Sequence, residues 1–150
     1  MAKPPFGFEK PADSPGFLLW QTTMLWQRKI KKSLEPYDIS HAQFVIMAVL
    51  LWFDKNKYDP TQTSIINWTK LDKMTVSQCI KKLVSQGLLT RVEHATDTRA
   101  KNVSLTSDGK TLILSLVPIV ESIDVDFFKP LSPADNQSFI QTLNILTSQS

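Results

Sequence analysis

The sequence contains little cysteine and little glycine, and it has no long apolar run. Its single cysteine, Cys79, excludes an internal disulfide framework and a four-cysteine zinc site, which makes a reducing cytoplasm the expected setting. Only four glycines occur in 150 residues, and no segment repeats at a fixed period, so a repeat architecture is excluded. The longest apolar run, residues 44–53, is too short to span a bilayer and fits a fully buried helix.

The residues that are present fit one globular domain with a mainly helical fold. Hydrophobic residues make up 42% of the chain, which is enough to form a core at this length. Residues 1–13 contain three prolines and no apolar core, so we expect neither a signal peptide nor a membrane anchor there. We interpret residues 1–14 as a flexible arm and residues 15–150 as a single domain of a soluble protein.

Positive charge is concentrated in one part of the chain. Residues 70–101 include seven Lys or Arg and three Asp or Glu, a net charge of +4, whereas the rest of the chain totals −1. A local basic excess of this kind is typical of a surface that faces a polyanion. Ordinary solvated helix faces explain it equally well, so charge alone leaves both interpretations open.

Two helix starts are predicted in the first third of the chain. Ser14 followed by Pro15 is an N-cap and first-turn pair, and the periodic run after it continues to about residue 34. This helix carries apolar residues on two sides, so a single packing partner would not cover it. Ser40 and Gln43 form a capping-box pattern ahead of the apolar run, which places the second helix at the centre of the fold.

A pair of shorter helices is predicted in the middle of the chain. Residues 61–68 are typical of a short helix, and Asp72 caps a further helix that runs to about residue 86, where Gly87 supplies a left-handed stop. Its buried stripe is predicted to be Val76, Ile80, Leu83 and Val84. Its opposite side, which faces water or a ligand, carries Thr75, Gln78, Lys81, Lys82 and Ser85.

A hairpin and two more helices complete the predicted order. Residues 88–93 and 103–105 alternate apolar and polar, which predicts two strands joined by the polar loop 94–101. Thr106 then caps a long helix in which Pro118 is an expected kink, and a last helix follows. The expected fold class is therefore mainly α with a small β-hairpin, an α+β arrangement.

Two short helices joined by a tight turn and followed by a hairpin with a basic loop form a winged helix-turn-helix. In this arrangement the second helix fits the major groove of DNA, and the hairpin, called the wing, reaches an adjacent minor groove. The side chains suit that use, since short donors and acceptors lie near the helix start and cations follow for phosphates. The candidate DNA-binding residues are Lys73, Thr75, Ser77, Gln78, Lys81, Lys82, Arg99 and Lys101.

A series of short motifs runs from residue 71 to residue 109. They are a leucine with a polar cap, a Thr-Val-Ser helix start, a Gly-Leu-Leu strand start, an Asp-x-Arg loop tip and a Leu-Thr-x-x-Gly helix entry. Their residues are Leu71, Asp72, Thr75, Val76, Ser77, Gly87, Leu88, Leu89, Asp97, Arg99, Leu105, Thr106 and Gly109. In this order they resemble the MarR (multiple antibiotic resistance regulator) family of transcription factors, and the helix order extends the match from about residue 16 to the C-terminus.

The resemblance implies roles for individual residues. Thr75, Ser77 and Gln78 would face bases, Arg99 would enter the minor groove, and Asp97 would brace the wing. The expected function is that of a sequence-specific DNA-binding transcriptional regulator, most often a repressor in such families.

The resemblance also implies an assembly and an effector. The helices at 15–35 and 107–150 would form a homodimer, and residues 40–106 would form the winged helix-turn-helix part. The dimer would bind a pseudo-palindromic operator in double-stranded DNA. A small aromatic effector would weaken that binding, although the sequence does not identify the residues that hold it. No cofactor and no membrane partner are expected.

The alternatives to DNA binding are a protein-interaction module, an enzyme and a metal-binding protein. A protein-interaction module without DNA binding stays open, but Asp97, Arg99 and Lys101 in one exposed loop favour DNA, since a minor groove attracts such a loop. An enzyme is not expected, because no nucleophile and base are placed together and no glycine-rich phosphate loop exists. A metal site is not expected either, because His41 and His94 lack partners at ligand spacing.

Three further features are interpreted as structural. Cys79 lies beside Ile80 and is interpreted as a small packed thiol, although the neighbouring lysines leave a redox role open. The four tryptophans are interpreted as core residues. The basic cluster at 28–32 lies near a helix end, where cations favour the helix dipole, and we interpret it as a solvated face.

Overall fold

The computed structural model of the chain describes residues 5–93 and 101–149. It is mainly helical with one two-stranded antiparallel sheet, which confirms the predicted fold class. The elements are η1 (Pro11–Asp13), α1 (Pro15–Leu34), η2 (Glu35–Tyr37), α2 (His41–Asn56), α3 (Gln62–Thr69), α4 (Lys73–Ser85), β1 (Leu89–Glu93), β2 (Lys101–Leu105), α5 (Ser107–Phe128) and α6 (Pro133–Thr147). No helix in this part of the chain is both long and apolar enough to cross a membrane.

Side-chain caps begin the α-helices where the sequence predicts them. At α2 both halves of the capping box are present, since the Gln43 N–H donates to Ser40 Oγ at 3.1 Å and the Ser40 N–H donates to Gln43 Oε1 at 2.8 Å. The other caps are Ser14 for α1, Thr61 for α3, Asp72 for α4, Thr106 for α5 and Ser132 for α6. The helix boundaries are therefore set by local chemistry.

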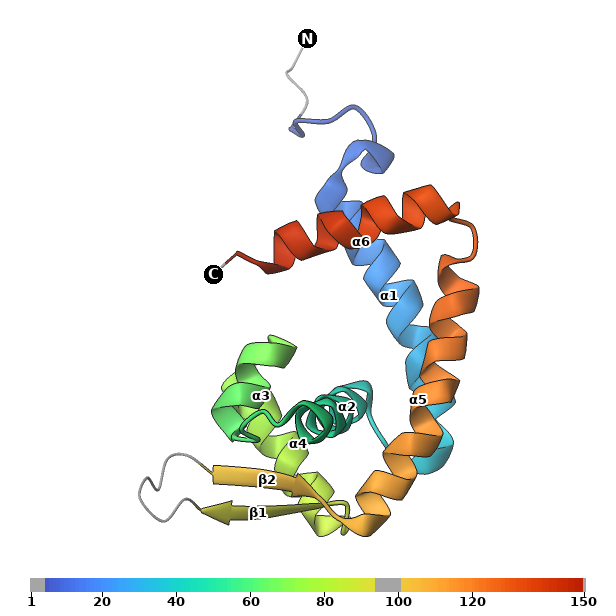
Figure 1. Ribbon diagram of the computed structural model, residues 1–150. Helices are drawn as coiled ribbons and strands as arrows, with labels where there is room; N and C mark the ends of the chain where they lie inside the picture. The colour runs from blue at the N-terminus through green and yellow to red at the C-terminus, as the bar shows by residue number, and fades with distance from the viewer. Residues whose placement is uncertain (1–4, 94–100, 150) are drawn as a thin grey trace.

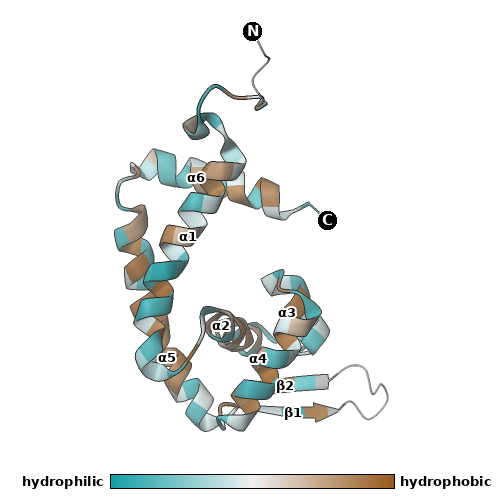
Figure 2. Cartoon of the chain, turned by 180° about the vertical axis from the view of Figure 1, so that it is seen from behind, coloured by the Kyte–Doolittle hydropathy of each residue, from teal (hydrophilic) through white to brown (hydrophobic). Residues whose placement is uncertain are grey.

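Helix α2 is the centre of the core, as its apolar run predicts. Ile46, Met47 and Phe53 are buried on it, and α3, α4 and α5 pack around it. Figure 2 shows this helix coloured brown for hydrophobic and enclosed by other elements. The prediction for α4 was wrong at Val84, which is 38% exposed, because it lies one residue, about 100° of helix, beyond the buried Leu83.

The hairpin is tied to the start of α3. The strands pair from Leu89 with Leu105 to Glu93 with Lys101. The Val103 N–H donates to the Pro60 carbonyl at 2.8 Å, so the base of the wing is fixed to the segment that leads into α3. The predicted wing residues Asp97 and Arg99 lie outside the described residues.

The start of α5 is locked against the end of α4. The Thr106 hydroxyl donates to the Gly87 carbonyl at 2.7 Å, and Gly87 itself takes the predicted left-handed conformation with φ of 75°. Gly109 is buried so close to this turn that an added Cβ would overlap the carbonyl oxygen of Leu88. The Leu-Thr-x-x-Gly motif therefore joins α4, the hairpin and α5 into one rigid unit.

The terminal helices extend away from this core. Helix α5 rises from the hairpin with α1 beside it, and α6 follows at the end of α5 that lies far from the hairpin (Figure 1). The large apolar side chains exposed on these helices are Phe17, Leu18, Leu19, Trp20, Leu25, Leu114, Val125, Ile140, Ile145 and Leu146. No residue of α6 is buried. No element of the described chain covers these exposed apolar side chains.

The interpretation of the tryptophans as core residues was wrong for three of the four. Trp20 is 62% exposed on the protruding half of α1, and Trp52 and Trp68 are also exposed, with ring centroids 4.6 Å apart at the corner between α2 and α3. Trp26 is half-buried, and its Nε1–H donates to Asp124 Oδ1 at 2.8 Å. The sequence does not reveal this difference, because a helical run leaves open which of its apolar faces the same chain covers.

Candidate nucleic-acid interface

A tight left-handed turn sets the angle between α3 and α4. Lys70 has φ of 61°, a conformation that costs a non-glycine residue about 1–2 kcal/mol. Around it, the Leu71 N–H donates to Thr69 Oγ1 at 3.2 Å, and the Thr75 N–H donates to Asp72 Oδ1 at 2.7 Å. These bonds hold the turn and cap α4, so the first turn of α4 is rigid where a recognition helix must meet bases.

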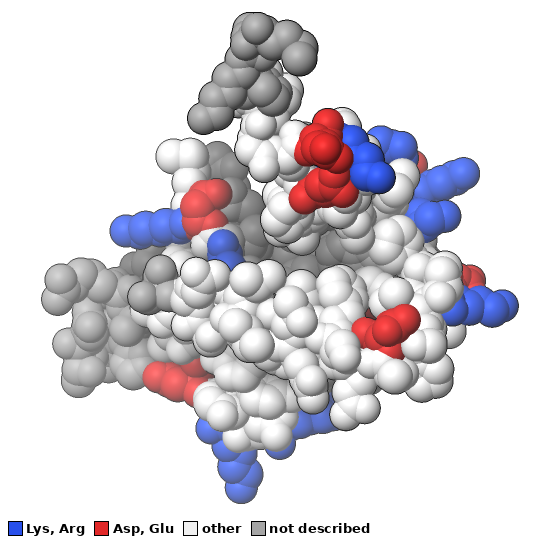
Figure 3. Space-filling model, turned by 90° about the horizontal axis from the view of Figure 1, so that it is seen from above, with Lys and Arg blue, Asp and Glu red and all other residues white. Residues whose placement is uncertain are grey.

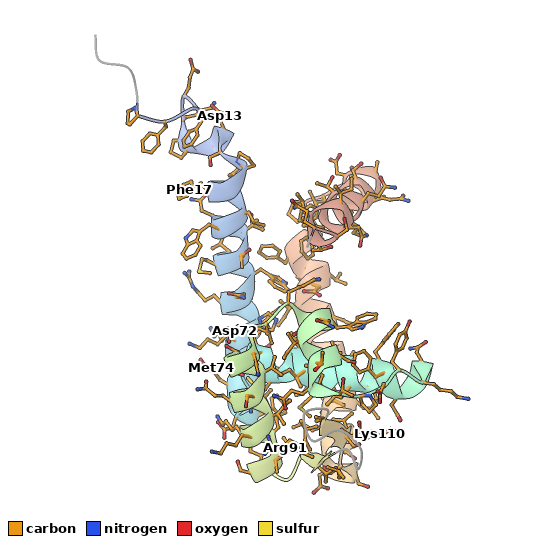
Figure 4. The ribbon with its side chains drawn as sticks, turned by 90° about the vertical axis from the view of Figure 1, so that its left-hand side faces the viewer. Asp13, Phe17, Asp72, Met74, Arg91 and Lys110 are labelled. Carbon is orange, nitrogen blue, oxygen red and sulfur yellow. The ribbon has the colours of Figure 1, made fainter. Side chains whose placement is uncertain are left out.

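Helix α4 has one buried side and one outward side. Val76, Ile80 and Leu83 are buried against the core. The outward side is polar and cationic, and its exposed residues are Lys73, Met74, Gln78, Lys81, Lys82 and Ser85. Figure 4 shows Asp72 and Met74 at the N-terminal end of α4, which lies in front of α1 in that view. Lys73, Gln78, Lys81 and Lys82 are thus all exposed on α4, with Lys73 and Lys82 on the two flanks of its outward side.

Two predicted base-facing residues are less accessible. Thr75 and Ser77 are half-buried, and the Thr75 hydroxyl donates to Asp72 Oδ2 at 2.8 Å. These bonds lower the pKa of the Asp72 carboxyl, so it accepts them as a carboxylate at neutral pH. Thr75 therefore takes part in the cap through both its N–H and its hydroxyl. Lys101 begins β2, and its side chain lies outside the described residues.

Two exposed residues next to the candidate interface, Met74 on α4 and Arg91 on β1, were missed from the sequence. Met74 is 70% exposed on the first turn of α4, an unusual position for an apolar side chain. Its spacing of four residues before Gln78 is the signal that could have found it. Arg91 is exposed on β1 at the foot of the wing, beyond α4 (Figure 4).

The C-terminal end of α4 is bonded to the connection between α1 and α2. The fully buried Gln43 donates from Nε2 to Gln86 Oε1 at 3.0 Å, and Gln86 Nε2 donates to the Asp38 carbonyl at 3.0 Å. Lys82 Nζ lies 3.9 Å from Asp38 Oδ1, an exposed ion pair of small energetic weight. The orientation of α4 is therefore tied to the segment that follows α1.

Burial controls the chemistry of Cys79. The thiol is half-buried on α4, and this burial raises its pKa more than the positive charge of Lys82 lowers it. The thiol is therefore protonated at neutral pH, which is the unreactive form. In the described part of the chain, no three His, Cys, Asp or Glu side chains gather as a metal site requires.

Two of the hollows that border the central helix bear on function. One of about 560 Å³ lies between α1, the start of α2 and Lys82 of α4. Its lining residues are Met24, Gln27, Arg28, Lys31, Glu35, Asp38, Ile39, Ser40, His41 and Lys82. The other, of about 250 Å³, is almost wholly apolar and lies on α2 and α3 beside Trp52 and Trp68.

The order of α3, α4 and the two-stranded hairpin defines the class of protein, which is a winged helix-turn-helix protein. The family model described as "ArnR1-like, winged-helix domain" matches residues 35–123. The HTH-type transcriptional regulator YdcH of Bacillus subtilis is 35% identical over 129 residues, which cover 86% of this chain and 88% of YdcH. The chain belongs to the MarR-type winged-helix family of transcriptional regulators.

Solved structures have the same fold. The structure of BpsR from Bordetella bronchiseptica, described for regulation of its DNA binding by 6-hydroxynicotinic acid, matches 96% of this chain and all of its own at a TM-score of 0.84 and 24% identity. MepR of S. aureus, solved as a DNA complex, matches 90% of this chain and 97% of its own at a TM-score of 0.80 and 24% identity. At this level of identity the likeness establishes the fold.

Proposed function

We propose that this protein is a sequence-specific DNA-binding repressor that acts as a homodimer on a pseudo-palindromic operator. The observation that carries the proposal is the outward side of α4, where Lys73, Gln78, Lys81 and Lys82 stand exposed on a helix fixed at both ends. An amide among cations suits a major groove, because the amide reads a base edge while the cations bind phosphates. The DNA complex of MepR, which has the same fold, supports this use.

The terminal helices support the dimer. Helix α6 has 15 residues, none of them buried, and a lone helix of this length is marginal in water. Its only charged residue is Asp135, and the surface seen from above is uncharged over its middle, with Lys and Arg at the margins (Figure 3). A second copy would cover Ile140, Ile145 and Leu146, the large apolar side chains exposed on α6, and a two-fold dimer matches an operator with two similar half-sites.

The proposal also includes a small-molecule effector that weakens DNA binding. BpsR, whose DNA binding is regulated by 6-hydroxynicotinic acid, shares the fold. The apolar hollow beside Trp52 and Trp68 offers an aromatic surface for a compound of similar size. Aromatic acids and phenols are therefore the first class to screen by thermal shift.

Selection from random duplex DNA tests the main proposal. The purified protein is incubated with duplexes of random sequence, and the bound fraction is amplified and sequenced through several rounds. We expect a palindromic sequence with half-sites about one helical turn apart, roughly 34–36 Å. Sedimentation of the free protein and of the complex then gives the number of copies bound. Enrichment of no sequence, together with no salt-dependent retention on DNA, would favour the protein-interaction alternative.

A further inference from the structure

We propose that the hollow between α1 and α4 is a second phosphate site, in which Arg28 and Lys31 of α1 bind the DNA backbone beside Lys82. This inference rests on the proposed DNA-binding function and extends the interface to a helix outside the winged part. The ligand is a backbone phosphate of the duplex that α4 contacts.

The structure divides the basic cluster of α1 into two groups. Arg28 and Lys31 line the hollow, together with Gln27, Met24 and Glu35, residues that recur every three or four positions on one helix face. Lys29 and Lys32 are also exposed but do not line it. All four side chains are exposed, as the interpretation of a solvated face requires, but only Arg28 and Lys31 border the hollow.

Lys82 connects the hollow to the candidate DNA-binding surface. Lys82 is exposed, and it is the α4 residue that lines the hollow. It lies seven residues after Thr75, which is in the first turn of α4. Seven residues correspond to about 10.5 Å along a helix, a distance that spans roughly three nucleotides of one strand. A strand that passes the first turn of α4 would therefore bring a phosphate toward Lys82 and, beside it, toward Arg28 and Lys31.

The start of α2 adds to the attraction for an anion. Ser40 and His41, which form the N-terminal end of this 16-residue helix, line the same hollow. The capping box occupies the N–H groups of Ser40 and Gln43, and the helix dipole places partial positive charge at this helix end. The helix end and the three cations therefore act on the same space.

Two carboxylates in the hollow limit its positive potential. Glu35 and Asp38 face the three cations, so the lining has a net charge of +1 with His41 neutral. Asp38 Oδ2 also lies 3.4 Å from Gln86 Nε2, which directs this carboxylate toward the end of α4. Because a phosphate can displace an exposed ion pair, Lys82 can exchange its contact with Asp38 for one with DNA.

The test compares two double variants of equal charge in the full-length protein. R28A/K31A removes the cations that line the hollow, and K29A/K32A removes two that do not. Affinity for the selected operator and for a scrambled duplex is measured at several salt concentrations. We expect R28A/K31A to weaken binding to both duplexes and to lower the salt slope by about two units, or about 0.9 for each lost phosphate contact. We expect K29A/K32A to stay close to the parent.

A second readout separates direct contact from net charge. Ethylation of individual phosphates should interfere with binding of the parent at a position beside each half-site, and this interference should disappear in R28A/K31A while the others remain. Thermal unfolding checks that both variants fold. Equal losses of DNA affinity in the two variants, or parental DNA affinity in R28A/K31A, would overturn the phosphate site. Absence of DNA binding by the parent would instead refute the proposed function.

Discussion

At the scale of single residues, Gln78 and Lys82 occupy the same exposed side of α4 but have different chemistry. An amide can donate to and accept from one base edge, whereas an ammonium group attracts any phosphate. Thr75, predicted as a partner of the bases, is instead engaged by Asp72. Sequence specificity is therefore expected to depend on Gln78 more than on Thr75.

Substitution of these two residues should separate specificity from affinity. Gln78→Ala should cost about 1–3 kcal/mol on the operator and little on scrambled DNA, because only the operator offers the matching base edge. Lys82→Ala should weaken binding to both duplexes and lower the salt slope by about one unit. Titrations of both variants on both duplexes at two salt concentrations measure this. A uniform loss with Gln78→Ala would show that its amide does not read sequence.

The pH dependence of stability should report on His41. Burial lowers the pKa of His41 below its usual value of 6.5, although the carboxylate of Asp124 acts in the opposite direction. The unfolded chain therefore binds more protons near pH 6, so the free energy of unfolding rises with pH there. The contribution is complete above about pH 6.5 and is lost as the pH falls below it.

Thermal unfolding of the parent and of His41→Gln between pH 5 and pH 8 measures this contribution. The parent should lose stability on acidification, and the variant, which cannot titrate at this position, should lose less. The comparison uses the slope of stability against pH for each protein. The variant also loses the packing of His41 on Trp26, but that loss is the same at every pH and does not change the slope. Parallel curves would contradict the expectation.

At the scale of elements, the helix-turn-helix and the wing form a unit because their joints are bonded. The Thr106 hydroxyl joins α5 to the turn after α4, and the Val103 N–H joins the wing to the segment before α3. Gly109 permits the first joint, since its missing side chain lets α5 approach the carbonyl of Leu88. The position of α4 relative to α5 therefore depends on this close approach together with the Thr106 hydrogen bonds.

Gly109→Ala should destabilise the protein although alanine favours helices. The added methyl group would overlap the Leu88 carbonyl, and such overpacking typically costs about 1–3 kcal/mol. Gly16→Ala is the matched control, because Gly16 lies in the first turn of α1 and a Cβ there meets nothing within 4 Å. It should leave stability unchanged or raise it by up to about 1 kcal/mol. Denaturant titration of both variants gives the comparison, and equal stabilities would refute the steric argument.

At the scale of the whole molecule, the exposed apolar residues of α1, α5 and α6 require a partner. An apolar surface spread over three helices is more than a soluble monomer usually exposes. Phe139 of α6 packs near Phe128 of α5, with ring centroids 5.7 Å apart, but the outer residues Ile140 and Ile145 are left in solvent. The single chain is therefore half of the expected assembly.

A charge placed on α6 should dissociate the dimer. Ile145→Asp would bury a carboxylate in the proposed interface, and a loss of about 2 kcal/mol or more corresponds to at least about a 30-fold weaker dimer. Asn67→Asp adds the same charge at an exposed position of α3, outside the three helices of the proposed interface, and is the control. Sedimentation over a range of concentrations measures both. A parent that sediments as a stable folded monomer would contradict the proposed dimer.

The sequence by itself determined the elements and their order, since these depend on local signals. The caps at Ser14, Ser40 and Asp72, and the left-handed stop at Gly87, lie where they were predicted, because each involves residues within one helical turn. The motifs from residue 71 to residue 109 likewise led to the correct family.

Only the tertiary structure decided which faces of those elements are covered and which charged residues meet. Trp26 is half-buried while Trp20 is exposed on the same helix, because α2 and α5 lie beside only one half of α1. Arg28 and Lys82 are 54 positions apart in the chain, yet they line one hollow. Such contacts depend on how the helices cross, and the spacing of residues along one helix contains no information about the angle to the next.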